Sequence, residues 1–177
     1  MCSLQDKMGF MWFGTKDGLN RFDGYTFKTF RKTPEAQGSI GNNFILSLYE
    51  DEQSVLWVGT SKGLYQYNRS TEKFSLDSGT SNLEIQKIIE DKRGNFWFIS
   101  GFALYRYVKQ TKRLHYYNPA KFFNATSLCN TADGSLWIGT MKGQINRYDP
   151  EKDAFYSLAH IAAISAENPV NKGVAFF

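Results

Sequence analysis

Residues 9–23 read GFMWFGTKDGLNRFD, and three later stretches repeat the same phrase. These are SVLWVGTSKGLYQYN at 54–68, GNFWFISGFALYRYV at 94–108 and GSLWIGTMKGQINRYD at 134–149. Their tryptophans are spaced by 45, 40 and 40 residues: Trp12, Trp57, Trp97 and Trp137. A period of about 40 to 50 residues, made of short strands and turns, is typical of the blades of a β-propeller.

Each repeat divides into four short strands. One strand precedes the tryptophan phrase, one carries the tryptophan, one follows the next turn, and a fourth closes the repeat. Four antiparallel strands make one propeller blade, and no sustained 3.6-residue period indicates a helix. We therefore expect an all-β chain with four blades at about residues 1–30, 42–77, 83–117 and 123–158. Residues 159–177 are expected to form a tail or the truncated start of a fifth blade.

Aspartates recur in the turn between the first two strands, at Asp6, Asp51 and Asp91. Aspartate accepts hydrogen bonds from nearby backbone amides, and the glycine that follows it supplies a positive φ. Ser54 replaces this glycine in the second repeat. A metal site is less favoured, because each blade contributes only one such carboxylate.

The recurring tryptophans are interpreted as packing residues of the repeat, and not as platforms for a ligand. Arginine recurs in the third strand at Arg21, Arg106 and Arg147, with Gln66 in the same place in the second repeat. A regular position in a strand favours hydrogen bonding between blades over ligand contact.

Two repeats depart from the common phrase. The third has Ile99 and Ser100 where the others have Gly-Thr, and Ala103 where the others have a turn glycine. The fourth carries one extra residue before its third strand, which predicts a bulge or a longer turn.

The composition supports sheet structure and argues against several functions. Aromatic residues make up 16% of the 177 residues, and such side chains suit a pleated, packed surface. The net charge of +4 comes from scattered side chains, so nucleic-acid binding is not expected. No apolar stretch is long enough to span a membrane, and the first residues lack the pattern of a signal peptide.

The chain lacks the usual signatures of catalysis, metal binding or a cofactor. Cys2 and Cys129 lie far apart and predict no disulfide framework, and the apolar flank of Cys129 predicts a buried thiol. Neither His115 nor His160 has a metal-ligand spacing. No nucleophile elbow, phosphate loop or zinc-protease motif occurs. We predict no enzymatic activity, no metal and no cofactor in this chain.

A binding face can be predicted from topology. In a four-stranded antiparallel blade, the turn between the second and third strands lies on the same side as the link to the next blade. Loops on a rigid scaffold are the usual place for function. The candidate ligand-binding residues on this side are Lys16, Asp17, Asn43, Lys62, Phe102 and Lys142.

The first repeat matches almost intact the string D-x-x-G-x-x-W-x-G-T-x-x-G-L-x-R-(F/Y)-D. In this it resembles the two-component regulator propeller repeat, and the resemblance covers nearly all of residues 2–158. Such repeats occur in periplasmic sensor regions of hybrid two-component histidine kinases of Bacteroidetes. The resemblance implies part of a seven-bladed propeller, an oligosaccharide ligand, a dimeric parent sensor and a kinase outside this chain.

Three interpretations remain at this point. The first is a ligand-sensing fragment of a longer sensor, which would expose its end blades and self-associate. The second is a self-contained four-bladed propeller that acts as an interaction scaffold or lectin, with residues 161–177 completing the first blade. The third, a propeller-based lyase or hydrolase, lacks convergent acid and base residues.

Overall fold

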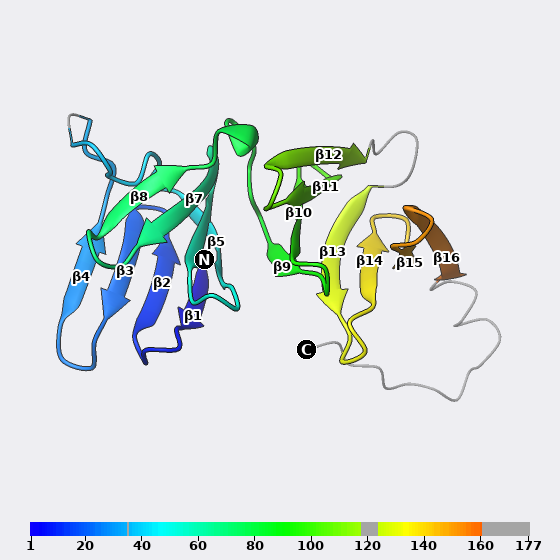
Figure 1. Cartoon of the computed structure of the whole chain (residues 1–177), viewed down its shortest axis with the longest axis horizontal. Coiled ribbons are helices and arrows are strands. Elements are labelled where there is room, and N and C mark those ends of the chain that lie inside the picture. Colours follow the sequence, from blue (N-terminus) through cyan, green and yellow to red (C-terminus); the bar gives the residue numbers. More distant parts are fainter. Residues whose placement is uncertain (35, 118–123, 161–177) are drawn as a thin grey trace.

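The four repeats form four separate four-stranded antiparallel sheets, which lie side by side as an array of blades (Figure 1). The computed structural model describes residues 1–34, 36–117 and 124–160. The all-β, four-blade prediction is confirmed. The described residues contain only one short helical segment, the 3-10 turn η1 (Ser78–Thr80), and no helix in them is long and apolar enough to cross a membrane.

The first two blades, here called A and B, occupy the N-terminal half of the array. Blade A has the strand order β1 (Cys2–Gln5), β2 (Met11–Thr15), β3 (Gly18–Phe22) and β4 (Phe27–Phe30). Blade B has the order β5 (Ile45–Glu50), β6 (Leu56–Thr60), β7 (Gly63–Asn68) and β8 (Lys73–Leu76).

Blades C and D follow with the same topology. Blade C has the order β9 (Ile88–Glu90), β10 (Asn95–Ser100), β11 (Ala103–Val108) and β12 (Arg113–Tyr117). Blade D has the order β13 (Ala125–Asn130), β14 (Leu136–Thr140), β15 (Gln144–Asp149) and β16 (Ala154–His160). The expected role of residues 161–177, as a fifth blade or as the closing segment of a ring, lies outside the described residues.

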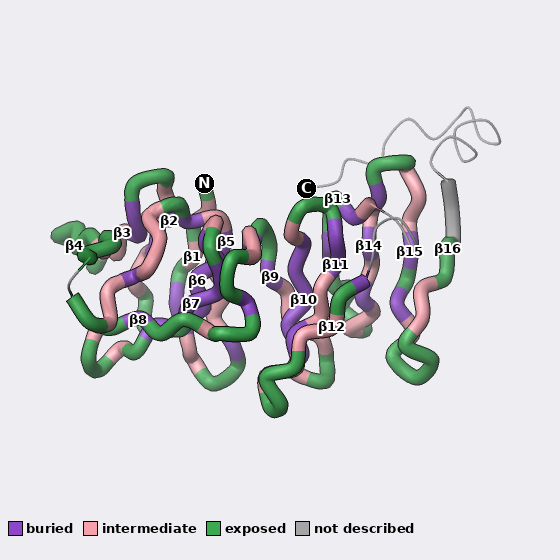
Figure 2. The backbone as a smooth tube through the Cα atoms, turned by 90° about the horizontal axis from the view of Figure 1, so that it is seen from above, coloured by how far each residue is buried: buried purple, intermediate pink, exposed green. Residues whose placement is uncertain are grey.

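The first strands of successive blades are neighbours: β1 contacts β5, β5 contacts β9, and β9 contacts β13. The fourth strand of each blade is therefore at the outer edge of the array. Burial reflects this arrangement. Strand β10, in the interior of the array, is almost wholly buried, whereas β4, at the outer edge of blade A, is mostly exposed (Figure 2).

Within residues 1–34, 36–117 and 124–160 the hydrophobic core consists of three clusters, one at each junction between blades. The A/B cluster packs Trp12 of blade A against Val58, Tyr67 and Phe74 of blade B. The B/C cluster is built in the same way around Trp57, and the C/D cluster around Trp97. These three tryptophans are at most 8% exposed, whereas Trp137 of blade D is only half-buried. The difference arises because a blade's tryptophan is covered by the following blade.

In blades A and B, the glycine two positions after the tryptophan makes room for the following blade. A Cβ on Gly14 would meet Ile45 of blade B at 2.7 Å, and a Cβ on Gly59 would meet the Ile85 carbonyl oxygen at 2.7 Å. Blade C has Ile99 at this position, and the residue from the following blade in the same cluster is the smaller Ala125. In the C/D cluster the larger of these two residues therefore belongs to the earlier blade and the smaller one to the following blade.

The extra residue of the fourth repeat lies in the turn between β14 and β15. Trp57 is paired with Gln66, nine residues later, whereas Trp137 is paired with Arg147, ten residues later. The prediction of a longer turn is therefore confirmed, and the arginine keeps its place beside the tryptophan.

Candidate functional site

The turns between second and third strands are hydrogen-bonded to the links between blades. Gly18 N donates to Asn43 O at 2.8 Å, and Gly63 N donates to Leu83 O at 2.8 Å. At the third junction the donor and acceptor are reversed, because Ala125 N donates to Phe102 O at 2.9 Å. These turns and links form one side of the array, which we call the turn-and-link face.

A threonine at the end of the tryptophan strand shapes these turns. Thr15 Oγ1 donates to Gly18 O at 2.9 Å and accepts a hydrogen bond from Asp17 N at 3.1 Å. Thr60 makes the same two contacts, donating to Gly63 O at 2.9 Å and accepting from Lys62 N at 3.0 Å. The Gly-Thr pair is thus explained by backbone structure, since glycine admits the following blade and threonine closes the turn.

Five of the six predicted ligand-binding residues, all except Asn43, are exposed at the tips of these turns. Lys16, Lys62 and Lys142 are exposed on blades A, B and D. Blade C presents Phe102, whose side chain is 49% exposed and whose φ of 66° lies in the left-handed region. Non-glycine residues rarely adopt this conformation, and such residues are enriched at functional sites.

Asp17 and Asn43 are engaged in local structure. An ion pair of 2.7 Å joins the Asp17 carboxylate to Arg31, whose Nε also donates to the Asp17 carbonyl at 3.0 Å. Asn43 Oδ1 accepts a hydrogen bond from Lys32 N at 2.6 Å. These two residues fix the long link between blades A and B, and the other four residues remain available to a ligand.

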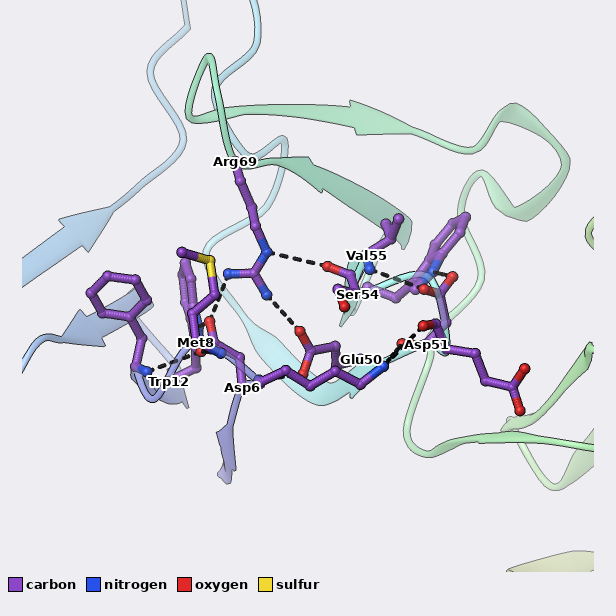
Figure 3. Close-up of polar contacts among 12 residues, drawn as sticks. Asp6, Met8, Trp12, Glu50, Asp51, Ser54, Val55 and Arg69 are labelled. Carbon is purple, nitrogen blue, oxygen red and sulfur yellow. Dashed lines mark hydrogen bonds and ion pairs between the residues drawn. The ribbon is translucent and has the colours of Figure 1, made fainter.

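On the opposite side of the array, the turn aspartates form clusters that the sequence interpretation missed (Figure 3). Asp6 Oδ1 accepts from Met8 N at 3.0 Å and Phe10 N at 2.9 Å, which closes the turn as expected. Asp6 Oδ2 accepts from Trp12 Nε1 at 2.7 Å and from Arg69 Nη1 of blade B at 2.7 Å. One buried carboxylate therefore closes a turn, orients the core tryptophan and binds the next blade.

Arg69 joins Asp6 to a second carboxylate and to a backbone carbonyl. Arg69 Nη2 donates to Glu50 Oε1 at 2.7 Å, and Arg69 Nε donates to Ser54 O at 3.2 Å. Burial alone would raise the pKa of Asp6, but the hydrogen bonds from Trp12 and Arg69 outweigh it and hold that pKa below its ordinary value. Asp6 stays ionised, and its oxygens are occupied by four donors.

The same pattern recurs in blades B and C. Trp57 Nε1 donates to Asp51 at 2.9 Å and Trp97 Nε1 donates to Asp91 at 2.8 Å. At the B/C junction Lys109 takes the place of Arg69, and it lies 3.5 Å from Asp51 and pairs with Glu90. These carboxylates are structural, and in the described residues no group of three or more His, Cys, Asp or Glu side chains could hold a metal ion.

Two of the three recurring arginines, Arg21 and Arg106, bind the following blade, as predicted for this strand position. Arg21 Nη1 donates to the Tyr67 hydroxyl at 3.2 Å, and Arg21 also pairs with Glu72 at 3.2 Å. Arg106 contacts the Tyr148 hydroxyl and pairs with Asp153 at 3.1 Å.

The prediction for Cys129 is wrong, because its thiol is exposed. Successive side chains of a strand point to opposite faces, and in β13 it is Leu128 that is buried in the C/D cluster. Cys2 and Cys129 are both free thiols.

Comparisons with known proteins agree with this architecture. The family model described as Two component regulator propeller matches residues 39–62 and 122–142. A curated protein named Histidine kinase P4, from Formosa agariphila, is 61% identical over 36 residues, which are 20% of this chain and 3% of that protein.

Solved structures are similar over most of the chain. The extracellular domain of a protein described as a hybrid two component system from B. thetaiotaomicron is 25% identical with a TM-score of 0.72, over 89% of this chain and 24% of that one. Virginiamycin B lyase from Staphylococcus aureus matches with a TM-score of 0.67 at 14% identity, over 89% of this chain and 54% of the lyase, and shows the fold alone.

The fold and the repeated junctions define the chain as a β-propeller array. Its repeats are similar to those of the two-component regulator propeller, whose family model matches parts of blades B and D, and to those of the solved extracellular domain. The chain spans about a quarter of the length of that sensor domain and a few per cent of the curated kinase.

Proposed function

We propose that this chain is part of the ligand-sensing propeller of a two-component sensor, placed outside the cytoplasm. Its ligand is an oligosaccharide derived from a glycan, and the signal passes to a kinase outside this chain. Two similarities support the proposal: a solved relative is an extracellular domain of a hybrid two component system, and a curated relative is named a histidine kinase. The proposal covers both the ligand-sensing role of this chain and the kinase activity of the longer sensor.

The observation that carries the proposal is the row of exposed side chains on the turn-and-link face. Lys16, Lys62 and Lys142 occupy the same turn of three blades, and Phe102 occupies that turn in blade C. An ammonium group donates up to three hydrogen bonds to sugar hydroxyls or carboxylates, and an aromatic ring offers an apolar surface to a sugar ring. The lysines favour a ligand that carries negative charge.

The same face offers a route for the signal. The turns that carry Lys16 and Phe102 are hydrogen-bonded to the links into the next blades. An oligosaccharide that bridges two turns would bear directly on a junction between blades. Packed junctions change by discrete shifts and not by continuous deformation, so such a ligand favours one arrangement of neighbouring blades over another.

Titration calorimetry of the purified chain with a panel of neutral and acidic oligosaccharides tests this function. For a sugar that binds, Lys62→Ala and Phe102→Ala are expected to weaken binding by about tenfold each, the loss that accompanies one good contact of about 1.4 kcal/mol. Lys152→Ala is the matched control, because Lys152 is an exposed lysine in the turn between β15 and β16. Equal affinities in all variants, with unchanged unfolding midpoints, would exclude the turn-and-link face as the binding site.

A further inference from the structure

The three junctions inside the array differ in how the third strand of one blade meets the next blade. At the A/B junction, Arg21 donates to the Tyr67 hydroxyl at 3.2 Å and pairs with Glu72 at 3.2 Å. At the C/D junction, Arg106 pairs with Asp153 at 3.1 Å. Glu72 and Asp153 hold the same position, directly before the fourth strand of their blade. An arginine therefore ties the third strand of one blade to a turn of the following blade at both junctions.

The B/C junction has different residues at both of these positions. Gln66 is paired with the tryptophan of its blade, at the place that Arg21 holds in blade A. Lys112 stands directly before the fourth strand of blade C and has a φ of 53°, close to the 54° of Glu72 and the 48° of Asp153. A glutamine and a lysine form no ion pair, so the arginine bridge of the other two junctions is missing here.

A stacked ring at the end of the fourth strand marks the same two junctions. Phe30 of blade A is stacked on Trp12 with ring centroids 5.8 Å apart, and it packs edge-on against Phe74 of blade B at 5.5 Å. Tyr117 of blade C is stacked on Trp97 at 5.5 Å and packs edge-on against Phe155 of blade D at 5.1 Å. Such aromatic pairs bury a large apolar area and fix the geometry of the rings.

Blade B has an aspartate at the position of this ring. Asp77 lies opposite Leu64 and donates from its backbone N to Leu64 O at 2.9 Å. Its carboxylate accepts hydrogen bonds from the Tyr107 hydroxyl of blade C and from Gly79 N at 3.1 Å. A polar contact to the link between the blades therefore stands where the other two junctions bury a ring against the next blade.

The turns on the side opposite the turn-and-link face show the same difference. Lys7 Nζ of blade A donates to two backbone carbonyls of blade B, at 2.9 and 3.0 Å. Arg93 of blade C donates to Pro150 O of blade D at 3.1 Å. The same turn of blade B carries Glu52 and Gln53, and within residues 1–34, 36–117 and 124–160 neither side chain makes a hydrogen bond to blade C.

Blades B and C are joined by other contacts. The Tyr49 hydroxyl donates to Glu90 at 3.0 Å, and Lys109 lies 3.5 Å from Asp51. Strand β2 contacts β5 at the A/B junction and β10 contacts β13 at the C/D junction, whereas the corresponding strands β6 and β9 make less contact. The B/C junction therefore relies more heavily on the apolar cluster around Trp57.

We propose that the array opens first at the B/C junction, because the arginine bridge and the stacked ring are absent there. Blades A and B then form one cooperative unit, and blades C and D form another. Proteins open locally in contiguous units whose free energies of opening differ. The link from β8 to β9, which contains η1, passes between the two pairs (Figure 1). This opening does not depend on whether the turn-and-link face binds an oligosaccharide.

Distances between spin labels test this order of opening. Pairs of labelled cysteines span one junction each, in a chain that also carries Cys2→Ser and Cys129→Ser. The exposed labelling sites, one per blade, are Thr29→Cys, Ser75→Cys, Thr111→Cys and Ser157→Cys. Electron paramagnetic resonance measures each distance distribution as urea is raised below the unfolding transition. We expect the distribution across B/C to broaden at a lower urea concentration than those across A/B and C/D. Broadening of all three together, or first at A/B or C/D, overturns the proposal.

Exchanging the junction residues tests their part in this order. Gln66→Arg with Lys112→Glu gives the B/C junction the missing ion pair. At a given urea concentration it should lower the open population there about tenfold, which corresponds to about 1.4 kcal/mol. Arg21→Gln with Glu72→Lys makes the reverse change and should bring the opening of A/B down to the urea concentration of B/C.

Lys142→Gln is the matched control, because it changes the net charge as the first exchange does, at an exposed turn tip of blade D. It should leave the order of opening unchanged. An unchanged order of opening in both exchange variants would overturn the proposal. The comparison of the three label pairs in the chain without these exchanges stands even if an exchange variant fails to fold.

Discussion

The first three blades and the fourth use the same tryptophan in different surroundings. In blades A, B and C an aspartate six residues earlier accepts a hydrogen bond from the indole N–H, and the next blade covers the ring. In blade D, Thr131 stands at that position and donates to Asp133, and Trp137 Nε1 is buried without an acceptor in the described residues. The repeat phrase therefore specifies a blade. A junction in which the tryptophan is covered and its indole N–H is hydrogen-bonded also needs the aspartate and a following blade.

The largest expected difference in stability between blades C and D comes from replacing their tryptophans by alanine. Trp97→Ala should lower the free energy of unfolding by about 3–5 kcal/mol, because it empties the centre of the C/D cluster. Trp137→Ala should cost about half as much or less, since part of its ring is already exposed. Urea denaturation followed by circular dichroism measures both, and equal losses would contradict the comparison.

The next largest difference between blades C and D is expected when the residue six positions before the tryptophan is replaced by alanine. Asp91→Ala leaves Trp97 Nε1 buried without a partner, which costs about 1–3 kcal/mol. The matched change Thr131→Ala removes no contact to an indole, so we expect a loss of about 0.5 kcal/mol or less. Chemical denaturation of the two variants side by side gives the difference. A similar loss in both would mean that the aspartate acts only through its turn.

Acid should weaken the junctions that contain these carboxylates. The pKa of Asp6 is lowered in the folded chain, where the donors Trp12 and Arg69 outweigh the effect of burial. Its contribution to stability is therefore fully present above its unfolded pKa of 3.8 and is lost as the pH falls through the lower folded value. Thermal unfolding from pH 6 to pH 3 should show this loss, and it should be smaller in Asp6→Asn. Identical pH profiles for the two proteins would contradict the assignment.

The smallest expected effect is a gain of stability. Thr131→Asp should give Trp137 the acceptor that the other three tryptophans have and raise the free energy of unfolding by about 1 kcal/mol. Thr131→Asn, which keeps a side-chain oxygen without the charge, is the control for repulsion by the neighbouring Asp133. Differential scanning calorimetry measures the shift. A gain with neither substitution would show that the Trp137 indole does not need this partner.

The fold was predictable because each repeat contains its own strands and turns. The period of the tryptophans, the turn glycines and the absence of a helical pattern are all local signals, and they led to four four-stranded blades. The aspartate six residues before three of the tryptophans was also visible, but its second role as the indole acceptor was not recognised. That role follows only when the strand pair brings the turn carboxylate over the ring.

The contacts between blades could not be predicted from the sequence in the same way. Arg69 reaches Asp6 across 63 positions, and Arg21 reaches Glu72 across 51, so no short pattern marks either pair. The exposure of Cys129 was missed because neighbouring apolar residues do not show which face of β13 is buried. The candidate ligand residues at the turn tips followed from topology alone.

The exchange of the four indole N–H protons with solvent is the measurement that decides whether an aspartate and a following blade together bury each tryptophan. A proton–nitrogen correlation spectrum of the chain should show four indole signals, which single Trp→Phe variants assign. We expect the indole N–H protons of Trp12, Trp57 and Trp97, each hydrogen-bonded to a carboxylate, to exchange slowly with solvent and their signals to shift when that aspartate is replaced by alanine. Trp137 should exchange faster and lack this dependence. Equal protection of all four indole N–H protons from exchange would contradict the claim that an aspartate and a following blade together bury the tryptophan at each junction.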